Sequence, residues 1–439
     1  MFLIGLTILL TTSFLGSRLK GLSLSMLGGL GMLLLLLLLR TPPAEPPVQI
    51  ILCIAAVVSA VGAIEAAGGL HYLVQVAEAL IRKHPNRIIY LSPLVTYLLT
   101  FLAGTNHIAY SILPIIAEVS KEVGIRPERP LSLAVVAALH GALASPISSI
   151  MVILAGFLSG TGITIATICK LIIPSTLFGL CIATFVVGQL KQSLPDAAQC
   201  LTPDVDPLHV AEKSARPFPK ATRKVKLSLG CFLLGSLWIV LTDAIKGLLP
   251  SWEIAGTKVF LPTSSILPLV MLATAALIMI LCRIPTHRMI TGKAFTAGIQ
   301  GMFSLLGIAW LSSTFVEGNK QTLLHCIGEH LSAPWQFSLI LLGMSAIMGS
   351  SAATIKAIFP LGIALAIPPK VLLASVAAVN GVFIIPVYPT MLAAIHLDTT
   401  GTTHIGKYLF NHSFMLPGLL SILGAVGMGF ILIHTLIPG

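Results

Sequence analysis

Two apolar stretches of the chain are similar to one another, and each is broken near its middle by proline and small polar residues. Residues 134–151 read AVVAALHGALASPISSIM, and residues 374–391 read ASVAAVNGVFIIPVYPTM. Aligned without a gap, with position 146 against position 386, they share a glycine, a proline and a methionine. Lipid cannot satisfy the backbone groups that such a break exposes, so the break must be buried in protein or line a wet cavity. Paired breaks of this kind indicate the binding site of a transporter.

The composition predicts an integral membrane protein. Hydrophobic residues make up 56% of the chain and charged residues 9%, whereas a soluble domain carries about 25% charged residues. The net charge of +11 comes from short basic clusters between apolar runs, so it indicates membrane topology and not nucleic-acid binding. The seven cysteines lack C-x-x-C spacing, and we interpret them as core residues. We therefore expect no metal and no cofactor.

The apolar runs predict an all-α polytopic protein with about 10 transmembrane helices and two re-entrant hairpins. The expected spans lie at 2–16, 21–39, 48–69, 130–158, 163–190, 227–249, 262–281, 294–314, 371–395 and 408–437. The first has no basic region or cleavage site, so we expect a retained helix and not a signal peptide. The hairpins are two pairs of short runs around polar breaks, 88–119 and 335–367. Amphipathic helices are expected at 70–81 and 316–331.

A basic, polar segment at 191–226 divides the chain, and we expect it to be a cytoplasmic linker. The N-terminal half is then 1–190, with a first repeat at about 48–190, and the C-terminal half is 227–439, with a second repeat at about 294–439. The repeat extends upstream, because Pro114 matches Pro360. Counting the crossings places one hairpin mouth in the cytoplasm and the other outside, which makes the repeats inverted. The alternative is a chance match of two apolar runs.

Four breaks in these helices, at 104–107, 145–149, 350–354 and 386–390, carry hydroxyls and an amide more than charges. A helix that restarts after a break presents free N–H groups and the positive end of its dipole, which together bind carboxylate or phosphate. The pattern therefore predicts a carrier for a small anion, with an anionic group at each end. The alternative for any one residue is that it only caps or kinks a helix. The candidate binding residues are Thr105, Asn106, Ser145, Ser148, Ser149, Ser351, Thr354, Tyr388 and Thr390.

Charged residues inside spans are costly and are functional candidates by default. Lys356 is the only lysine or arginine in the apolar run from 335 to 367, and the alternative for it is snorkelling to an interface. Glu65 and Glu118 are candidates for carrying a proton or for capping a helix near the interface. Asp243 is expected near the end of its span, in a structural role.

Ten strings spread over both halves resemble the Dcu family of anaerobic C4-dicarboxylate transporters, in its A and B branch. They are AGGLHYLV, SPLVTYLLTFLAGT, LPIIAEVSKE, RPLSLAVVAA, ASPIS, IAWLSSTFV, SSAATIKA, SVAAVNGVFIIPVYPT, DTTGTTHIGK and FNH. The resemblance implies antiport of fumarate, malate or aspartate for succinate, by alternating access, across the inner membrane of an anaerobically respiring bacterium. It also implies an ion-transporter-like fold and a homodimer. Some members act on a dicarboxylate sensor kinase, although nothing in this sequence demonstrates that contact.

The chain differs from the family pattern at several positions. His404 stands where the family has an arginine, Thr399 where an acid is common, and His107 alters the first break. Ser312 and Ser313 replace a usual Gly-Asp pair. These differences bear on substrate preference and on any charge-sensing role of the turn at 396–407. The secondary candidates for binding substrate are Lys356, Asp398, Thr400 and Thr402.

Two other functions are alternatives to the exchange of dicarboxylates. A proton- or ion-coupled carrier of another small anion calls for acidic residues at the breaks, and the four breaks contain none. A membrane enzyme calls for a catalytic or metal constellation, and the chain has no HExxH motif. His140 lies in a matched helix, but its counterpart is Asn380, which favours hydrogen bonding over catalysis.

Overall fold

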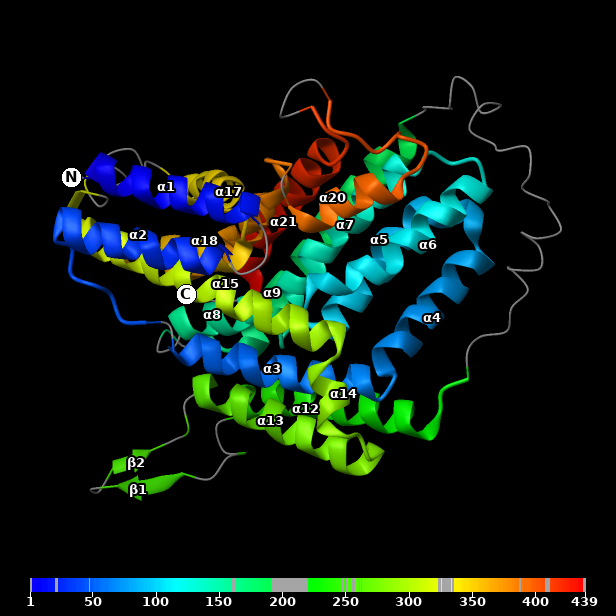
Figure 1. Cartoon of the computed structure of the whole chain (residues 1–439), viewed down its shortest axis with the longest axis horizontal. Coiled ribbons are helices and arrows are strands. Elements are labelled where there is room, and N and C mark those ends of the chain that lie inside the picture. The colour runs from blue at the N-terminus through cyan, green and yellow to red at the C-terminus, as the bar shows by residue number, and fades with distance from the viewer. Residues whose placement is uncertain are drawn as a thin grey trace.

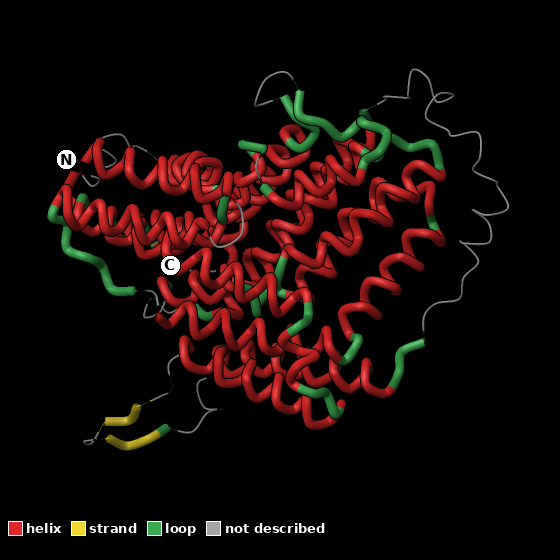
Figure 2. The backbone as a smooth tube through the Cα atoms, viewed as in Figure 1, coloured by secondary structure: helices red, strands yellow, loops and turns green. Residues whose placement is uncertain are grey.

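The computed structural model confirms an all-α polytopic architecture, with one short β-hairpin as the only described exception (Figures 1 and 2). In the hairpin, β1 (Trp252–Ile254) pairs antiparallel with β2 (Thr257–Val259). The structure describes residues 2–19, 23–46, 48–158, 161, 163–190, 220–245, 248, 251–254, 257–259, 261, 263–322, 325, 333, 335–386, 388–406 and 411–436. Most of the predicted linker therefore lies outside the described residues.

Seven helices of the described chain form one group, here called the flanking helices. They are α1 (Phe2–Leu19), α2 (Ser23–Leu39), α3 (Val48–Ala66), α12 (Arg223–Ala244), α13 (Thr263–Cys282), α14 (Thr286–Ile290) and α15 (Lys293–Gly318). α12 begins four residues before the expected 227, because Thr222 caps it by accepting from Val225 N. α15 continues to Gly318, so the amphipathic helix expected from 316 does not begin there.

The remaining long helices form a second group, here called the repeat helices. The first half supplies α5 (Ile88–Ala103), α6 (Ala109–Glu122), α7 (Glu128–Ala144), α8 (Ser149–Phe157) and α9 (Ile165–Gln189), with the 3₁₀ turns η1 (Pro85–Arg87) and η2 (Asn106–Ile108). The second half supplies α17 (Gln336–Met348), α18 (Ser351–Ala364), α19 (Pro369–Ser375), η3 (Val376–Phe383), α20 (Pro389–Leu397) and α21 (Met415–Leu436). Corresponding elements of the two halves occur in the same order along the chain.

A single described helix, α4 (Gly69–Lys83), connects the two groups. It confirms the amphipathic helix expected at 70–81 and bends by 68° from α3. The bend lies at Gly68, whose φ of +84° favours glycine. α4 then runs beside α6 at the right of Figure 1. The flanking helices meet the repeat helices mainly where α15 packs against α18, where α12 packs against α9 and where α3 and α13 pack against α8.

Two matched glycines, one in each repeat, lie where two helices approach closely. A side chain at Gly141 would lie 2.1 Å from Thr100 Oγ1, and one at Gly381 would lie 2.6 Å from Ser345 Oγ. Both glycines thus allow a close approach, of α7 to α5 in one half and of η3 to α17 in the other. α5 and α17 also end alike, at left-handed Gly104 and Gly349.

The second half departs from the expected boundaries in three places. α18 begins at Ser351 and not after 354, because Ser350 caps it by accepting from Ala353 N. The upstream part of the second broken helix is a short α-helix followed by η3, where three valines and a glycine have low helix propensity. α21 begins at Met415 and not at 408, because His412 pairs with Ile405 in an isolated bridge.

Five described helices are long and apolar enough to cross a membrane, and the bent pair of α3 and α4 would make a sixth. Shorter apolar segments, including α17 and α18, accompany them. The expected total of about 10 spans therefore stays a prediction, as does the re-entrant character of the two hairpins.

Candidate functional site

The structure brings the four breaks into one region among the repeat helices. Asn106 Nδ2, in the first break, donates to Tyr388 Oη in the fourth. Gly104 lies so close to the second break that an added Cβ would be 2.9 Å from Ile147 Cγ1. The helices that follow the breaks pair across the halves, since α6 packs against α20 and α8 against α18. Breaks 282 residues apart therefore share one site.

The second break combines a cap with an unsatisfied hydroxyl. Ser145 ends α7 in an extended conformation, is fully buried, and its Oγ has no hydrogen-bond partner among the described residues. Ser148 caps α8 and accepts from Met151 N at 3.2 Å. The side chain of Ser149 lies outside the described residues, as does that of His107. Ser148 therefore serves its own helix, whereas the Ser145 hydroxyl is available to a ligand.

The third break keeps the cap, which Ser350 provides for α18, and the fourth keeps the unsatisfied hydroxyl. Thr354 Oγ1 donates to Ser350 O within its own helix at 2.8 Å. Thr390, in the first turn of α20, is 2% exposed and its Oγ1 has no partner in the described chain. Tyr388 stands at the N-cap of α20 but makes no side-chain cap. Thr105 is half-buried in the first break.

A hydrogen-bonded chain links the two halves beside the breaks. Ser351 Oγ donates to Asn380 Oδ1 at 3.1 Å, and Asn380 Nδ2 lies 3.1 Å from His140 Nδ1. An amide nitrogen only donates, so His140 Nδ1 accepts and the neutral ring carries its proton on Nε2. That Nε2 is buried and has no partner in the described chain. Asn380 is not among the predicted site residues. Its alignment with His140 in the ungapped repeat was the feature from which their contact could have been predicted.

Lys356 is buried in the interior and not extended to a surface. It lies on α18, is 3% exposed, and its Nζ has no hydrogen-bond partner within the part of the chain that the structure describes. Snorkelling requires the ammonium to reach water or headgroups. The buried position of Nζ therefore contradicts snorkelling, and Lys356 stays a candidate for a functional role.

Four buried polar atoms at or beside the breaks share one chemistry. Such orphaned atoms are few in native proteins, and each calls for an explanation. All four can donate a hydrogen bond, and they are Ser145 Oγ, Thr390 Oγ1, His140 Nε2 and Lys356 Nζ. Orphaned hydroxyls also occur away from the breaks, as at Ser338 and Ser421. The central set differs from these because it lies beside interrupted helices and includes the Lys356 ammonium, and this combination suits an anionic ligand.

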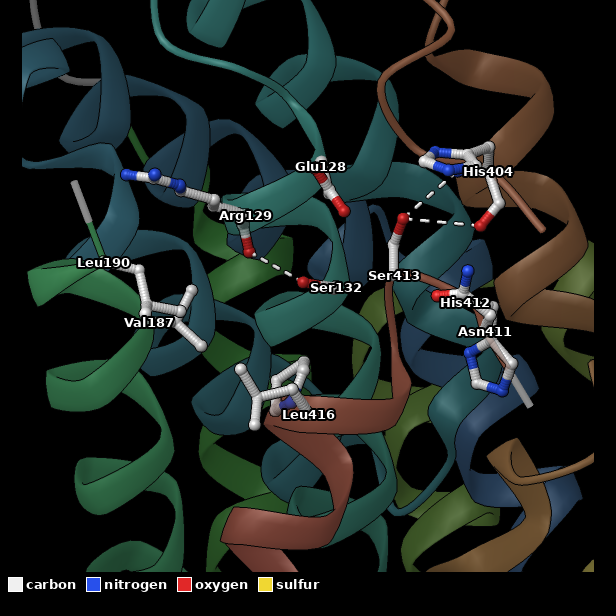
Figure 3. Close-up of a pocket in the computed structure, with 11 residues that line it drawn as sticks. Glu128, Arg129, Ser132, Val187, Leu190, His404, Asn411, His412, Ser413 and Leu416 are labelled. Atoms are coloured by element: carbon white, nitrogen blue, oxygen red, sulfur yellow. Dashed lines mark hydrogen bonds between the residues drawn. The ribbon is translucent and has the colours of Figure 1, made fainter. Parts of the chain in front are cut away.

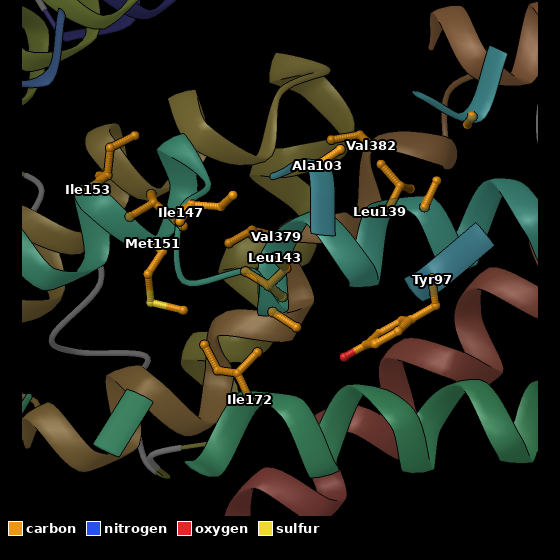
Figure 4. Packing of buried hydrophobic residues seen from close by; sticks show 14 of the residues in the cluster. Tyr97, Ala103, Leu139, Leu143, Ile147, Met151, Ile153, Ile172, Val379 and Val382 are labelled. Atoms are coloured by element: carbon orange, nitrogen blue, oxygen red, sulfur yellow. The ribbon is translucent and has the colours of Figure 1, made fainter. Parts of the chain in front are cut away.

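Buried apolar side chains surround the breaks (Figure 4). Leu143 precedes the second break, Ile147 lies within it and Met151 follows it, whereas Val379 and Val382 precede the fourth. They are at most 2% exposed. Because they exclude water, hydrogen bonds made inside this region are stronger than they would be at the surface.

The polar turn after α20 forms a separate structure in which the Asp398 carboxylate is satisfied by hydrogen bonds from within the turn. The Asp398 carboxylate accepts from Thr400 N at 2.9 Å and from Thr403 N at 2.6 Å, and both threonine hydroxyls at 400 and 402 donate to it. Burial acts to raise the pKa of Asp398, but these hydrogen bonds outweigh it and lower the pKa below its usual value. The turn is separated from the fourth break by the 9 residues of α20, or about 13 Å. The structure does not bring Asp398, Thr400 and Thr402 to the breaks.

A cavity of about 220 Å³ lies beside this turn (Figure 3). Its walls come from the start of α7, the end of α9 and the segment before α21, and include Glu128, Arg129, His404 and His412. Burial lowers the pKa of His412, and its bond to Ile384 O acts in the opposite direction. The 17 residues of α7 separate this cavity from the second break by about 25 Å.

The acidic candidates lie away from the breaks. Glu118 binds Arg82 Nη2 at 2.9 Å, and Glu78 and Glu122 bind the same guanidinium. This cluster holds α4 against α6. Glu65 lies at the end of α3, where its Oε2 would be 2.5 Å from a side chain at Gly292. The side chain of Asp243 lies outside the described residues.

The whole chain is similar to known membrane transporters. A family model, DcuA_DcuB, described as an anaerobic C4-dicarboxylate membrane transporter, matches residues 1–437. The C4-dicarboxylate transporters DcuA of Escherichia coli K12 and of Wolinella succinogenes are each 38% identical, over 98% and 100% of this chain and 99% and 100% of their own lengths. An E. coli protein named anaerobic C4-dicarboxylate transporter DcuB is 34% identical over 96% of both chains.

Two solved structures share the fold at low identity. The YdaH transporter of Alcanivorax borkumensis has a TM-score of 0.53 at 16% identity, over 88% of this chain and 85% of its own. MtrF of Neisseria gonorrhoeae has a TM-score of 0.54 at 14% identity, over 98% and 94%. One title names a transporter and the other an efflux pump, and the likeness supports the shared fold.

Proposed function

The chain belongs to the DcuA/DcuB family of anaerobic C4-dicarboxylate membrane transporters, and we propose that it exchanges C4-dicarboxylates across the bacterial inner membrane by alternating access. Its relatives of similar length carry C4-dicarboxylate in their names. The observation that carries the proposal is the set of four buried donor atoms, at or beside the breaks, that have no partner among the described residues. The substrates proposed are fumarate, malate, aspartate and succinate.

In this proposal both carboxylates bind at the breaks. One carboxylate pairs with the Lys356 ammonium, and the other accepts from hydroxyls and from the first-turn N–H groups of α8 and α20. Asn106 and Tyr388 close the site by joining the first and fourth breaks. The full proposed set is Thr105, Asn106, Ser145, Ser148, Ser149, Ser351, Thr354, Lys356, Tyr388 and Thr390. Asp398, Thr400 and Thr402 instead hold the turn.

The division into two groups of helices supports alternating access. The third break lies where the repeat helices meet the flanking helices, since Ala352 in the first turn of α18 and Phe295 of α15 both pack against Ile54 and Val58 of α3. Movement of one group past the other would carry a ligand at the breaks between the two sides of the membrane. α4 connects the groups and bends at Gly68, which makes it the covalent arm between them.

The test is counterflow in proteoliposomes with a panel of C4 acids. External labelled succinate should accumulate in vesicles loaded with fumarate, malate or aspartate. Ser145→Ala should raise the KM for succinate about 5-fold, because a hydrogen bond to a charged group contributes roughly 1 kcal/mol or more. Ser338→Ala is the matched control, since it also removes a buried orphaned hydroxyl but lies at the far end of α17. Equal KM values for both variants would place the ligand elsewhere, and uptake that ignores internal dicarboxylate would contradict exchange.

A further inference from the structure

Lys356 is surrounded by elements that offer its charge no counter-ion. α18 packs against α8, α15, α17, α19 and η3. Of these elements, only α15 contains an acidic residue, which is Glu317. Ala352, one turn before Lys356, and Met302 of α15 both pack against Ile54 and Val58 of α3. Glu317 lies 15 positions beyond Met302, or about 22 Å along the helix.

The breaks themselves contain no acid that could reach the ammonium. Glu118, the nearest acid in sequence to the first break, binds Arg82 at the end of α4. Asp398 is bound within its own turn. An unpaired buried cation is strongly unfavourable, and pairing it with a carboxylate relieves most of that cost. Substrate is therefore the counter-ion that the site lacks.

We propose that Lys356 makes this protein an obligatory exchanger, because its ammonium is unpaired in the empty carrier and paired in the loaded one. The inference rests on the proposed exchange of dicarboxylates at the breaks. Interconversion moves α18 along α15, so the empty carrier must carry an uncompensated charge past an apolar surface. The loaded carrier moves the same ammonium with a carboxylate beside it. The empty carrier consequently returns slowly, and flux in one direction requires substrate on the other side.

The proposal differs from a role in affinity alone. If Lys356 only contributed to binding, its removal would weaken net efflux and exchange together. If it also retains the empty carrier, its removal weakens binding but speeds the return of the empty carrier. The diagnostic quantity is the exchange ratio, defined as efflux of labelled succinate into fumarate divided by efflux into buffer without substrate.

The experiment measures this ratio in proteoliposomes loaded with saturating labelled succinate. The wild-type ratio should be high. Lys356→Gln should lower it about 10-fold, mainly through faster efflux into substrate-free buffer, because the charge that disfavours the empty transition is gone. Lys356→Arg keeps the charge and should keep the ratio. Lys370→Gln is the matched control, because it removes a lysine of the same repeat at the start of α19 and should leave the ratio unchanged.

The outcomes separate this inference from the function on which it rests. A wild-type ratio near one would contradict exchange itself. A high wild-type ratio that Lys356→Gln preserves would overturn the role of Lys356 and leave exchange standing.

A second measurement needs no variant, in case Lys356→Gln does not fold. Butyrate is succinate with one carboxylate replaced by a methyl group, so it can neutralise Lys356 without filling the second carboxylate position. External butyrate should compete with succinate for uptake and should accelerate efflux of labelled succinate from wild-type vesicles. Butyrate that does not compete, or that competes without accelerating efflux, would overturn the proposal.

Discussion

The breaks and the turn at 398–403 are both rich in hydroxyls, yet they differ in whether their charged group is satisfied by hydrogen bonds. In the turn, Asp398 accepts four hydrogen bonds from three threonines. At the breaks, the donors of Ser145, Thr390 and Lys356 have no partner among the described residues. A satisfied cluster stabilises a fold, whereas an unsatisfied one is explained by a ligand. Residue type alone does not distinguish the breaks from the turn, whereas the hydrogen bonding of their charged groups does.

The largest effect that this comparison predicts is on stability. Asp398→Asn should lower the free energy of unfolding by about 3 kcal/mol, because the amide replaces one acceptor with a donor that faces backbone N–H groups. The KM for succinate should stay within about 2-fold of wild type, since such sites away from the ligand do not change binding. Thermal unfolding of the purified protein and uptake by proteoliposomes measure the two quantities. Thr399→Ala, at an exposed neighbour, is the control and should change neither.

A large rise in KM for Asp398→Asn with unchanged thermal stability would reverse the assignment. It would mean that the turn binds substrate and that its internal hydrogen bonds are incidental.

The second prediction concerns the breaks, where binding should change more than stability. Tyr388→Phe should raise the KM for succinate about 10-fold, because it removes the hydroxyl that joins the first and fourth breaks and leaves Asn106 Nδ2 without this partner. Tyr90→Phe removes a hydroxyl from a tyrosine that is 49% exposed on α5 and should leave KM unchanged. Equal KM values for the two variants would show that closing the breaks on one another is unnecessary.

The sequence predicted the breaks because proline and serine interrupt apolar runs there. It predicted the α7 break well, since Pro146 follows Ser145 and Ser148 caps the next helix. It extends the third break too far, because Ser350 and Thr354 are both polar residues that interrupt an apolar run. In the structure Ser350 is the cap and Thr354 lies inside the helix.

Contacts between the halves were harder to predict. The chain from Ser351 through Asn380 to His140 depends on how the two repeats face one another, and neither repeat alone specifies that arrangement. The hydrogen bonding of Asp398 could be predicted from the local sequence. Gly401, with φ of +70°, allows the chain to fold back on the carboxylate. The composition of the turn indicates that hydroxyls are present, but it does not predict that they bond to the Asp398 carboxylate.

The third prediction uses pH to examine the turn. The pKa of Asp398 is lower in the folded state than in the unfolded chain, so its contribution to stability is complete above about pH 4 and is lost as pH falls through the folded pKa. Thermal unfolding midpoints of wild type should therefore fall between pH 5 and pH 3, by the equivalent of about 1 kcal/mol more than those of Asp398→Asn. Parallel pH profiles for the two proteins would contradict the stabilising role of the ionised carboxylate.

The smallest predicted effect is at Thr354, which is polar, buried and at a break, but satisfied. Its hydroxyl donates to Ser350 O, so Thr354→Val should change the KM for succinate by less than about 3-fold and cost roughly 1 kcal/mol of stability. Thr390→Val removes a hydroxyl of the same kind that has no partner in the described chain, and its effect on KM should be the larger of the two. Uptake kinetics of both variants in the same vesicles make the comparison. A larger effect at Thr354 would show that a hydroxyl bonded to its own helix still serves the ligand through its lone pairs, and that an unsatisfied donor is not what marks the site.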